Sequence, residues 1–183
     1  MNELIHSNES HLEFTNQEQQ YLSFQVDKGK LAVNITDVKE IIEIGNITRV
    51  PMMPNHIRGV INLRGSVVPV IDLSARLHGQ VNSIKKRSCI ILVQLISEDG
   101  NQSLGMLVDQ VDEILGIPAE NIQASPKFGS DIRIDFIQAM GRVSDEFIIL
   151  LDINRVLAIS ELSELNLLPL TDTVIEIEQQ TPR

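Results

Sequence analysis

The sequence predicts a mainly β fold built from two similar small barrels, and three observations lead to this prediction. Strand signals are short, rich in Val, Ile and Leu, and separated by turn residues about every 8 to 12 positions. Their order repeats once along the chain. The 183 residues include one Tyr, no Trp and five Phe, so aliphatic side chains have to fill the core. Because five such strands bury little surface alone, we expect the two units to pack into one body.

The first half of the chain contains five strand signals. Residues 21–26 and 31–35 flank the turn Asp27-Lys28-Gly29-Lys30, which predicts a hairpin. Residues 40–44 are rich in β-formers. Two further strands, 59–63 and 67–72, are joined through Arg64-Gly65-Ser66.

The second half restarts the same pattern. Strands are expected over residues 88–96, 104–108, 111–117, 132–143 and 147–152. A helix is expected over 153–157, extending toward residue 168. The chain therefore ends its strand pattern with a C-terminal helix.

Three pairs of segments indicate an internal repeat. Residues 38–44 match 111–117, with Val, Glu and Ile recurring in the same places. In the same way, Phe24-Gln25-Val26 matches Val93-Gln94-Leu95, and Val70-Ile71-Asp72-Leu73 matches Leu150-Leu151-Asp152-Ile153.

The repeat predicts how the chain is divided. We expect one barrel over about residues 19–84 and a second over about 85–157, and an exchange of strands between them is left open. A flexible acidic tail is expected over 1–18, and a C-terminal helix and acidic tail over 158–183.

Composition and charge limit the classes of function. Hydrophobic residues make up 43% and charged residues 22%, as in ordinary globular proteins. The net charge of −10 comes mostly from the two ends, where residues 1–26 hold four acids and no Lys or Arg. The one basic run, Lys85-Lys86-Arg87, is interpreted as a solvated linker. Without a basic face, nucleic acid is not an expected partner.

The expected location is the cytoplasm. The first residues carry neither the basic residues nor the apolar stretch of a signal peptide, and no window is long and apolar enough to span a membrane. Cys89 is the single cysteine, so no disulfide forms within the chain, and we expect it to be a buried small side chain. Direct membrane insertion is not expected.

No motif for catalysis is found in the sequence. The phosphate-binding loop, the dinucleotide fingerprint, the paired-His zinc motif and cysteine pairs are all missing. The acids Asp109, Asp112 and Glu113 are expected on one exposed turn, where they share one environment and do not suit acid–base catalysis. We therefore expect no catalytic residue, no metal and no cofactor; an enzyme on a small β-barrel is the remote alternative.

The two copies differ at one turn. Asn62-Leu63-Arg64-Gly65 in the first copy corresponds to Arg142-Val143-Ser144-Asp145 in the second. The barrel as such therefore does not require Arg64. Gly65 permits a tight turn, which makes it a structural residue.

This segment resembles the signature of the CheW family. The residues that carry the resemblance are 59–65 and 68–73, supported by 21–24, 36–42, 47–51, 105–109 and 147–152. The similarity covers about residues 20–157. It implies two five-stranded SH3-like barrels and a non-enzymatic adaptor that joins the cytoplasmic signalling tips of chemoreceptors to the regulatory domain of a CheA-type histidine kinase, at receptor arrays on the inner face of the membrane.

The resemblance also implies site residues. Contacts with the receptor are expected in a groove formed by Val38, Glu40, Ile41, Gly59, Arg64, Val108 and Val111. Contacts with the kinase are expected on the first barrel at Ile44, Ile47, Arg49 and Val50. Arg64 and Glu40 are predicted to form an ion pair, which Ser144 in the second copy cannot reproduce. A similar adaptor serving a twitching or second-messenger pathway is the alternative, and the sequence does not separate the two.

Overall fold

A computed structural model describes residues 18–97, 100–127 and 131–158, and these residues form two β-sheets with short helices. The mainly β fold predicted from the sequence is confirmed. No helix within these ranges is long and apolar enough to cross a membrane. Apart from residues 18 and 158, the tails expected at the two ends lie outside the described residues, as does the extension of the C-terminal helix toward residue 168.

The first repeat contains five strands and one α-helix. They are β1 (Gln19–Val26), β2 (Gly29–Asn34), β3 (Val38–Glu43), β4 (Ile57–Leu63), β5 (Ser66–Asp72) and α1 (Leu73–His78). A 3-10 turn, Ile35–Asp37, connects β2 to β3.

The second repeat follows the same order with small additions. It contains β6 (Cys89–Ser97), β7 (Gly100–Val108), β8 (Gln110–Ile117), β9 (Ile122–Gln123), β10 (Ile137–Val143), β11 (Glu146–Leu151) and α2 (Ile153–Val156). The strand expected over 132–143 begins only at Ile137, because Ile134–Phe136 forms a 3-10 turn before it.

The two sheets have the same internal order. Barrel I, as we name the sheet of β3 to β7, runs β3-β6-β7-β5-β4. Barrel II contains the other six strands and runs β8-β1-β2-β11-β10-β9. In each, one parallel pair (β5 with β7, β11 with β2) joins an antiparallel hairpin to the remaining strands. The matched sequence segments occupy equivalent strands: β3 and β8, β6 and β1, β5 and β11. The internal repeat is therefore confirmed.

The exchange of strands that the sequence left open is present, because each repeat contributes its first hairpin to the other barrel, so neither barrel ends at residue 84. The β1–β2 hairpin pairs with β8 and β11 of the second repeat. The β6–β7 hairpin pairs with β3 and β5 of the first. As a result barrel I is continuous in the chain, from Val38 to Val108, and barrel II is assembled from the segments on either side of it.

The exchanged hairpins contribute buried side chains to three apolar clusters. One fills each barrel, and a third, which we name the central core, lies between the two sheets. Strand β6 shows the pattern: Ile90 and Leu92 point into barrel I, whereas Ile91, Val93 and Leu95 point into the central core. A strand buried on both faces has a nearly continuous apolar sequence, which is the pattern of residues 89–93.

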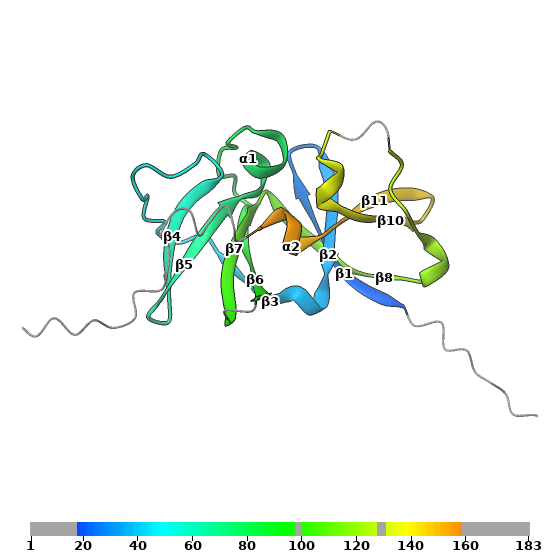
Figure 1. The fold of residues 1–183 in the computed structure, drawn as a ribbon, viewed down its shortest axis with the longest axis horizontal. Helices are drawn as coiled ribbons and strands as arrows, with labels where there is room; N and C mark the ends of the chain where they lie inside the picture. Colours follow the sequence, from blue (N-terminus) through cyan, green and yellow to red (C-terminus); the bar gives the residue numbers. More distant parts are fainter. Residues whose placement is uncertain (1–17, 98–99, 128–130, 159–183) are drawn as a thin grey trace, which may run out of the picture.

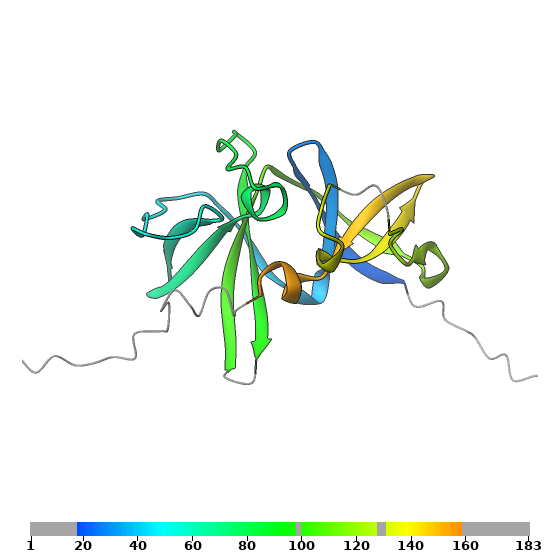
Figure 2. The same ribbon diagram turned by 45° about the horizontal axis from the view of Figure 1, so that its top comes forward.

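The barrels lie side by side with the central core between them (Figure 1). Helix α2 lies at the junction in both views (Figures 1 and 2). The Arg76 side chain of α1 donates through Nε to the carbonyl oxygen of Val156 in α2 at 2.7 Å. The junction is therefore a packed interface rather than a flexible linker.

Candidate functional site

The turn between β4 and β5 positions the candidate arginine. Arg64 and Gly65 both have left-handed backbones, with φ of 51° and 85°. A two-residue hairpin with both φ values positive matches the twist of the strands that it joins. The side-chain oxygen of Asn62 accepts a hydrogen bond from the backbone N–H of Gly65 at 2.9 Å, which closes the turn.

Arg64 and Glu40 form the predicted ion pair. The guanidinium donates through Nη1 to Oε1 at 2.8 Å and through Nη2 to Oε2 at 3.0 Å. Paired donors of this kind give charge-assisted bonds with a defined geometry. The hydrogen bond from Arg64 lowers the pKa of the Glu40 carboxyl below its ordinary value. The prediction that these two residues pair is confirmed.

The pair joins the two outer strands of barrel I. Glu40 lies on β3 and Arg64 follows β4, and these strands stand at opposite ends of the sheet order. The contact therefore closes one side of the barrel. The Arg64 side chain stays 74% exposed and that of Glu40 33%, so the pair is also available to a partner.

Barrel II lacks this pair. Its equivalent turn has the same backbone form, with φ of 48° at Ser144 and 65° at Asp145. Ser144 carries no positive charge, and Glu113 instead approaches Lys30 of β2, with 4.0 Å between Oε1 and Nζ. The two barrels thus share a fold, but only barrel I carries the Arg64–Glu40 ion pair between its outer strands.

The other expected groove residues do not all reach the surface. Ile41 is 45% exposed, while Val38 and Val111 are half-buried against the central core. Val108 is buried within that core. Val38 on β3 pairs with Val93 on β6, which in turn pairs with Leu104 on β7. Val108 lies four residues further along β7, so Val38 and Val108 are not neighbours in the sheet. Within the expected set, side-chain hydrogen bonds join Glu40 to Arg64.

Gly59 has a packing role that its position explains. It is buried at φ 148°, and a Cβ there would collide with the carbonyl oxygen of Thr48 and with Ile47. The missing side chain lets Thr48 and Val60 exchange two backbone hydrogen bonds, at 2.8 and 2.9 Å. Gly59 therefore allows the loop after β3 to pair with β4 through these two hydrogen bonds.

The expected kinase-contact residues lie on this loop between β3 and β4. Ile44 and Ile47 are half-buried against the core of barrel I. Arg49 is exposed and Val50 half-buried. The loop therefore presents one charged and several partly apolar side chains on a backbone held by the Thr48–Val60 bridge.

A polar cluster at the junction was not anticipated from the sequence. The carboxylate of Asp109, expected on an exposed turn, accepts from Lys85 Nζ at 2.8 Å and from the Asp27 N–H at 2.9 Å. Asn82 donates to both Asp27 and Asp109, and Ser74 Oγ donates to Asp27 at 2.6 Å. Lys85 is exposed, in agreement with its interpretation as part of a solvated linker, and its bond to Asp109 ties the linker after α1 to this cluster and raises the pKa of its ammonium.

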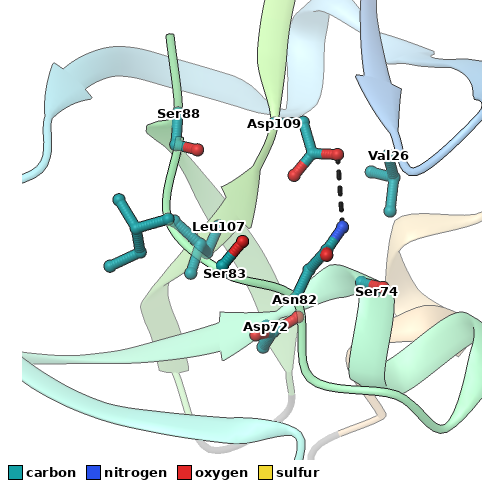
Figure 3. Close-up of a pocket in the computed structure, with 9 residues that line it drawn as sticks. Val26, Asp72, Ser74, Asn82, Ser83, Ser88, Leu107 and Asp109 are labelled. Atoms are coloured by element: carbon teal, nitrogen blue, oxygen red, sulfur yellow. Dashed lines mark hydrogen bonds between the residues drawn. The ribbon is translucent and has the colours of Figure 1, made fainter. Parts of the chain in front are cut away.

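Figure 3 shows the small hollow beside this cluster, with Asn82 directed at Asp109 and with Ser74 and Asp72 at its lower edge. It has room for about one water molecule. None of the buried side-chain polar atoms in the described part of the chain lacks a partner. Residues 18–97, 100–127 and 131–158 also contain no group of three or more His, Cys, Asp or Glu side chains that could hold a metal.

The buried carboxylate of Asp72 was also missed. It accepts from the Ala75 N–H at 3.0 Å, which caps α1, and from Arg58 Nη1 at 3.0 Å. Burial raises the pKa of this carboxyl, although the bonds from Ala75 and Arg58 act in the opposite direction. An Asp directly before an apolar helical segment is the sequence signal that could have identified the cap.

Comparisons with known proteins agree with this geometry. The family model described as "CheW-like domain" matches residues 20–161. The chain is 30% identical over 145 residues to the chemotaxis protein CheW of Klebsiella aerogenes, covering 79% of this chain and 85% of that protein. It is 34% identical over 142 residues to CheW of Rhizobium meliloti, covering 78% and 89%.

A solved structure is similar as well. The crystal structure of the scaffolding protein TtCheW from Thermoanaerobacter tengcongensis superposes with a TM-score of 0.67 at 30% identity. The match covers 74% of this chain and 85% of that one.

Proposed function

This chain belongs to the CheW-like domain family, and on that premise we propose that it is a non-enzymatic adaptor that couples chemoreceptors to a CheA-type histidine kinase. Its place of action in this proposal is the cytoplasm, at receptor arrays on the inner face of the membrane. The observation that carries the proposal is the Arg64–Glu40 pair, which is exposed and occurs in only one of two barrels of the same fold.

The proposed receptor surface is the wall of barrel I around this pair. An exposed ion pair contributes little to stability, so recognition is the better reason for its presence. Ile41 follows Glu40 on β3 and adds an exposed apolar side chain on the opposite face of that strand, which faces the junction. Val38 of β3 and Val111 of β8 are half-buried there against the central core, and a helical receptor tip suits such an apolar surface with a polar rim. Gly59 and Val108 are buried, so they are proposed to act through packing and not through direct contact with the receptor.

The proposed kinase surface is the loop that follows β3. Ile44, Ile47, Arg49 and Val50 lie on one short stretch of backbone that the Thr48–Val60 bridge holds against β4. Because the bridge removes backbone freedom before binding, less entropy is lost when a partner docks. A barrel-shaped kinase regulatory domain is the proposed partner there.

The proposal is tested by co-purification. The full chain is mixed with a CheA-type kinase and with a receptor fragment that contains the helical signalling tip, and each complex is isolated by size-exclusion chromatography. Binding to both is expected. If the chain binds neither partner, the adaptor role is wrong.

Arg64→Ala tests the role of the ion pair in receptor binding. The fold is expected to stay intact, with a thermal midpoint within about 3 °C of the parent, because the side chain is largely exposed. Affinity for the receptor fragment is expected to fall about three- to tenfold, since the partner loses a charged contact.

Ser144→Ala is the matched control for that variant, because Ser144 occupies the equivalent turn of barrel II. It is expected to leave receptor affinity unchanged. Equal affinities of the parent and Arg64→Ala, measured by isothermal calorimetry, would contradict the assignment of the receptor surface to this wall.

A further inference from the structure

The hydrogen bond between Asn62 and Gly65 restrains the turn that carries Arg64. Asn62 is the second-last residue of β4, and its side-chain oxygen holds the Gly65 N–H at 2.9 Å across the turn that carries Arg64. Asn62 itself is exposed, so its amide contributes no buried packing. The bond acts on the conformation of the turn.

The equivalent hairpin of barrel II shows that the turn forms without such a bond. Ser144 and Asp145 adopt the same two left-handed conformations between β10 and β11. The position of Asn62 is taken there by Arg142, and an arginine side chain has no acceptor atom to offer a backbone N–H. The Arg142 guanidinium instead donates to the Asn121 side chain at 3.2 Å. The feature that distinguishes the first hairpin is the ion pair of Arg64.

An ion pair at this exposed site depends on how well its arginine is held. The guanidinium must lie in the plane of the Glu40 carboxylate to make both bonds, at 2.8 and 3.0 Å. A long, exposed side chain loses conformational freedom when it does so, and a mobile backbone beneath it adds to that loss. Because the Asn62–Gly65 hydrogen bond already restrains the backbone of the turn, only the Arg64 side chain loses conformational entropy when the ion pair forms.

We propose that Asn62 is a positioning residue, which holds the Arg64 turn so that the guanidinium meets Glu40 and the pair is presented as one rigid unit. Its importance for binding rests on the proposed receptor role of that pair. The positioning itself concerns only this chain and is measured without a partner.

Asn62→Ala and Asn62→Ser in the full chain test the inference. Alanine removes the acceptor, whereas a serine hydroxyl can accept the same bond more weakly and adds no charge. With side-chain carboxyl carbons labelled, NMR follows the titration of Glu40. Asn62→Ala is expected to raise the pKa of Glu40 toward its ordinary value, and Asn62→Ser to raise it less. Receptor-fragment affinity is expected to fall about two- to fivefold in Asn62→Ala, with Asn62→Ser in between.

Arg142→Ala is the control, because it changes the same strand position in barrel II and should leave the Glu40 titration unchanged. An unchanged Glu40 titration in Asn62→Ala would overturn the inference. If Asn62→Ala does not fold, the Asn62→Ser titration decides in its place. If the parent protein fails to bind the receptor fragment, the proposed function is wrong, whereas the titration still decides whether Asn62 positions Arg64.

Discussion

At the scale of single residues, Gly59 is the position where packing leaves no room for a side chain. Gly59→Ala would place a Cβ against the backbone oxygen of Thr48 at a φ that residues with side chains rarely adopt. The expected loss is about 2 to 4 kcal/mol in the free energy of unfolding, from overpacking and backbone strain together. Urea denaturation followed by circular dichroism measures it.

Gly45→Ala is the control for this prediction. Gly45 lies in the loop that contains Thr48, and a Cβ there meets no atom within 4 Å. Its free energy of unfolding is expected to stay within about 0.5 kcal/mol of the parent. Equal losses in the two variants would show that Thr48 does not pack on Gly59 as described.

Individual residues were predicted well where the family resemblance supplied the pattern, and less well where burial decided. The resemblance placed Arg64 and Glu40 at matched family positions, which led to the correct ion pair. Val108 was expected in a binding groove and is instead buried in the central core. An apolar residue on a strand gives the same sequence signal on a groove and in a core, so the pattern could not separate them.

At the scale of elements, the two α-helices begin in the same way and differ in what surrounds their caps. Asp72 caps α1 and also holds Arg58, whereas Asp152 caps α2 by accepting from the N–H groups of Asn154 and Arg155. Removal of a cap costs about 1 kcal/mol, and removal of one partner from a largely buried ion pair costs more.

Asp72→Ala is therefore expected to destabilise the protein by about 2 to 4 kcal/mol, and Asp152→Ala by about 1 kcal/mol. Urea unfolding measures both free energies. The dependence of the free energy of unfolding on urea concentration is expected to stay unchanged, because a change would indicate an altered unfolded state. If the two variants lose the same stability, Arg58 adds nothing to the first cap.

At the scale of the whole molecule, the exchange of hairpins makes the two repeats depend on each other. A cut between residues 84 and 85 separates the β1–β2 hairpin from the rest of barrel II and the β6–β7 hairpin from the rest of barrel I. Each fragment would also expose its half of the central core. We expect fragments 1–84 and 85–183 to lack cooperative thermal unfolding when separate and to recover it when they are expressed together.

The contrasting fragment is 37–109, which contains all five strands of barrel I in one stretch. It is expected to keep a β-type circular dichroism spectrum and to bind an apolar dye through its uncovered central-core face. Cooperative unfolding of 1–84 or 85–183 alone would contradict the interdependence of the repeats.

The sequence by itself determined which segments become strands and that their order repeats. These features follow from local alternation and turn residues, which act between residues that are near in the chain. The pairing of Arg64 with Glu40 was predicted from the family resemblance. The tertiary structure alone decided which hairpin enters which barrel, and thereby the burial of Val108 and the contacts of Asp109. Both hairpins are apolar on their two faces and fit the same place in either sheet, so their own sequences favour neither barrel. Each hairpin pairs with strands of the other repeat, and such contacts between distant segments are not specified by local alternation, turn residues or charge.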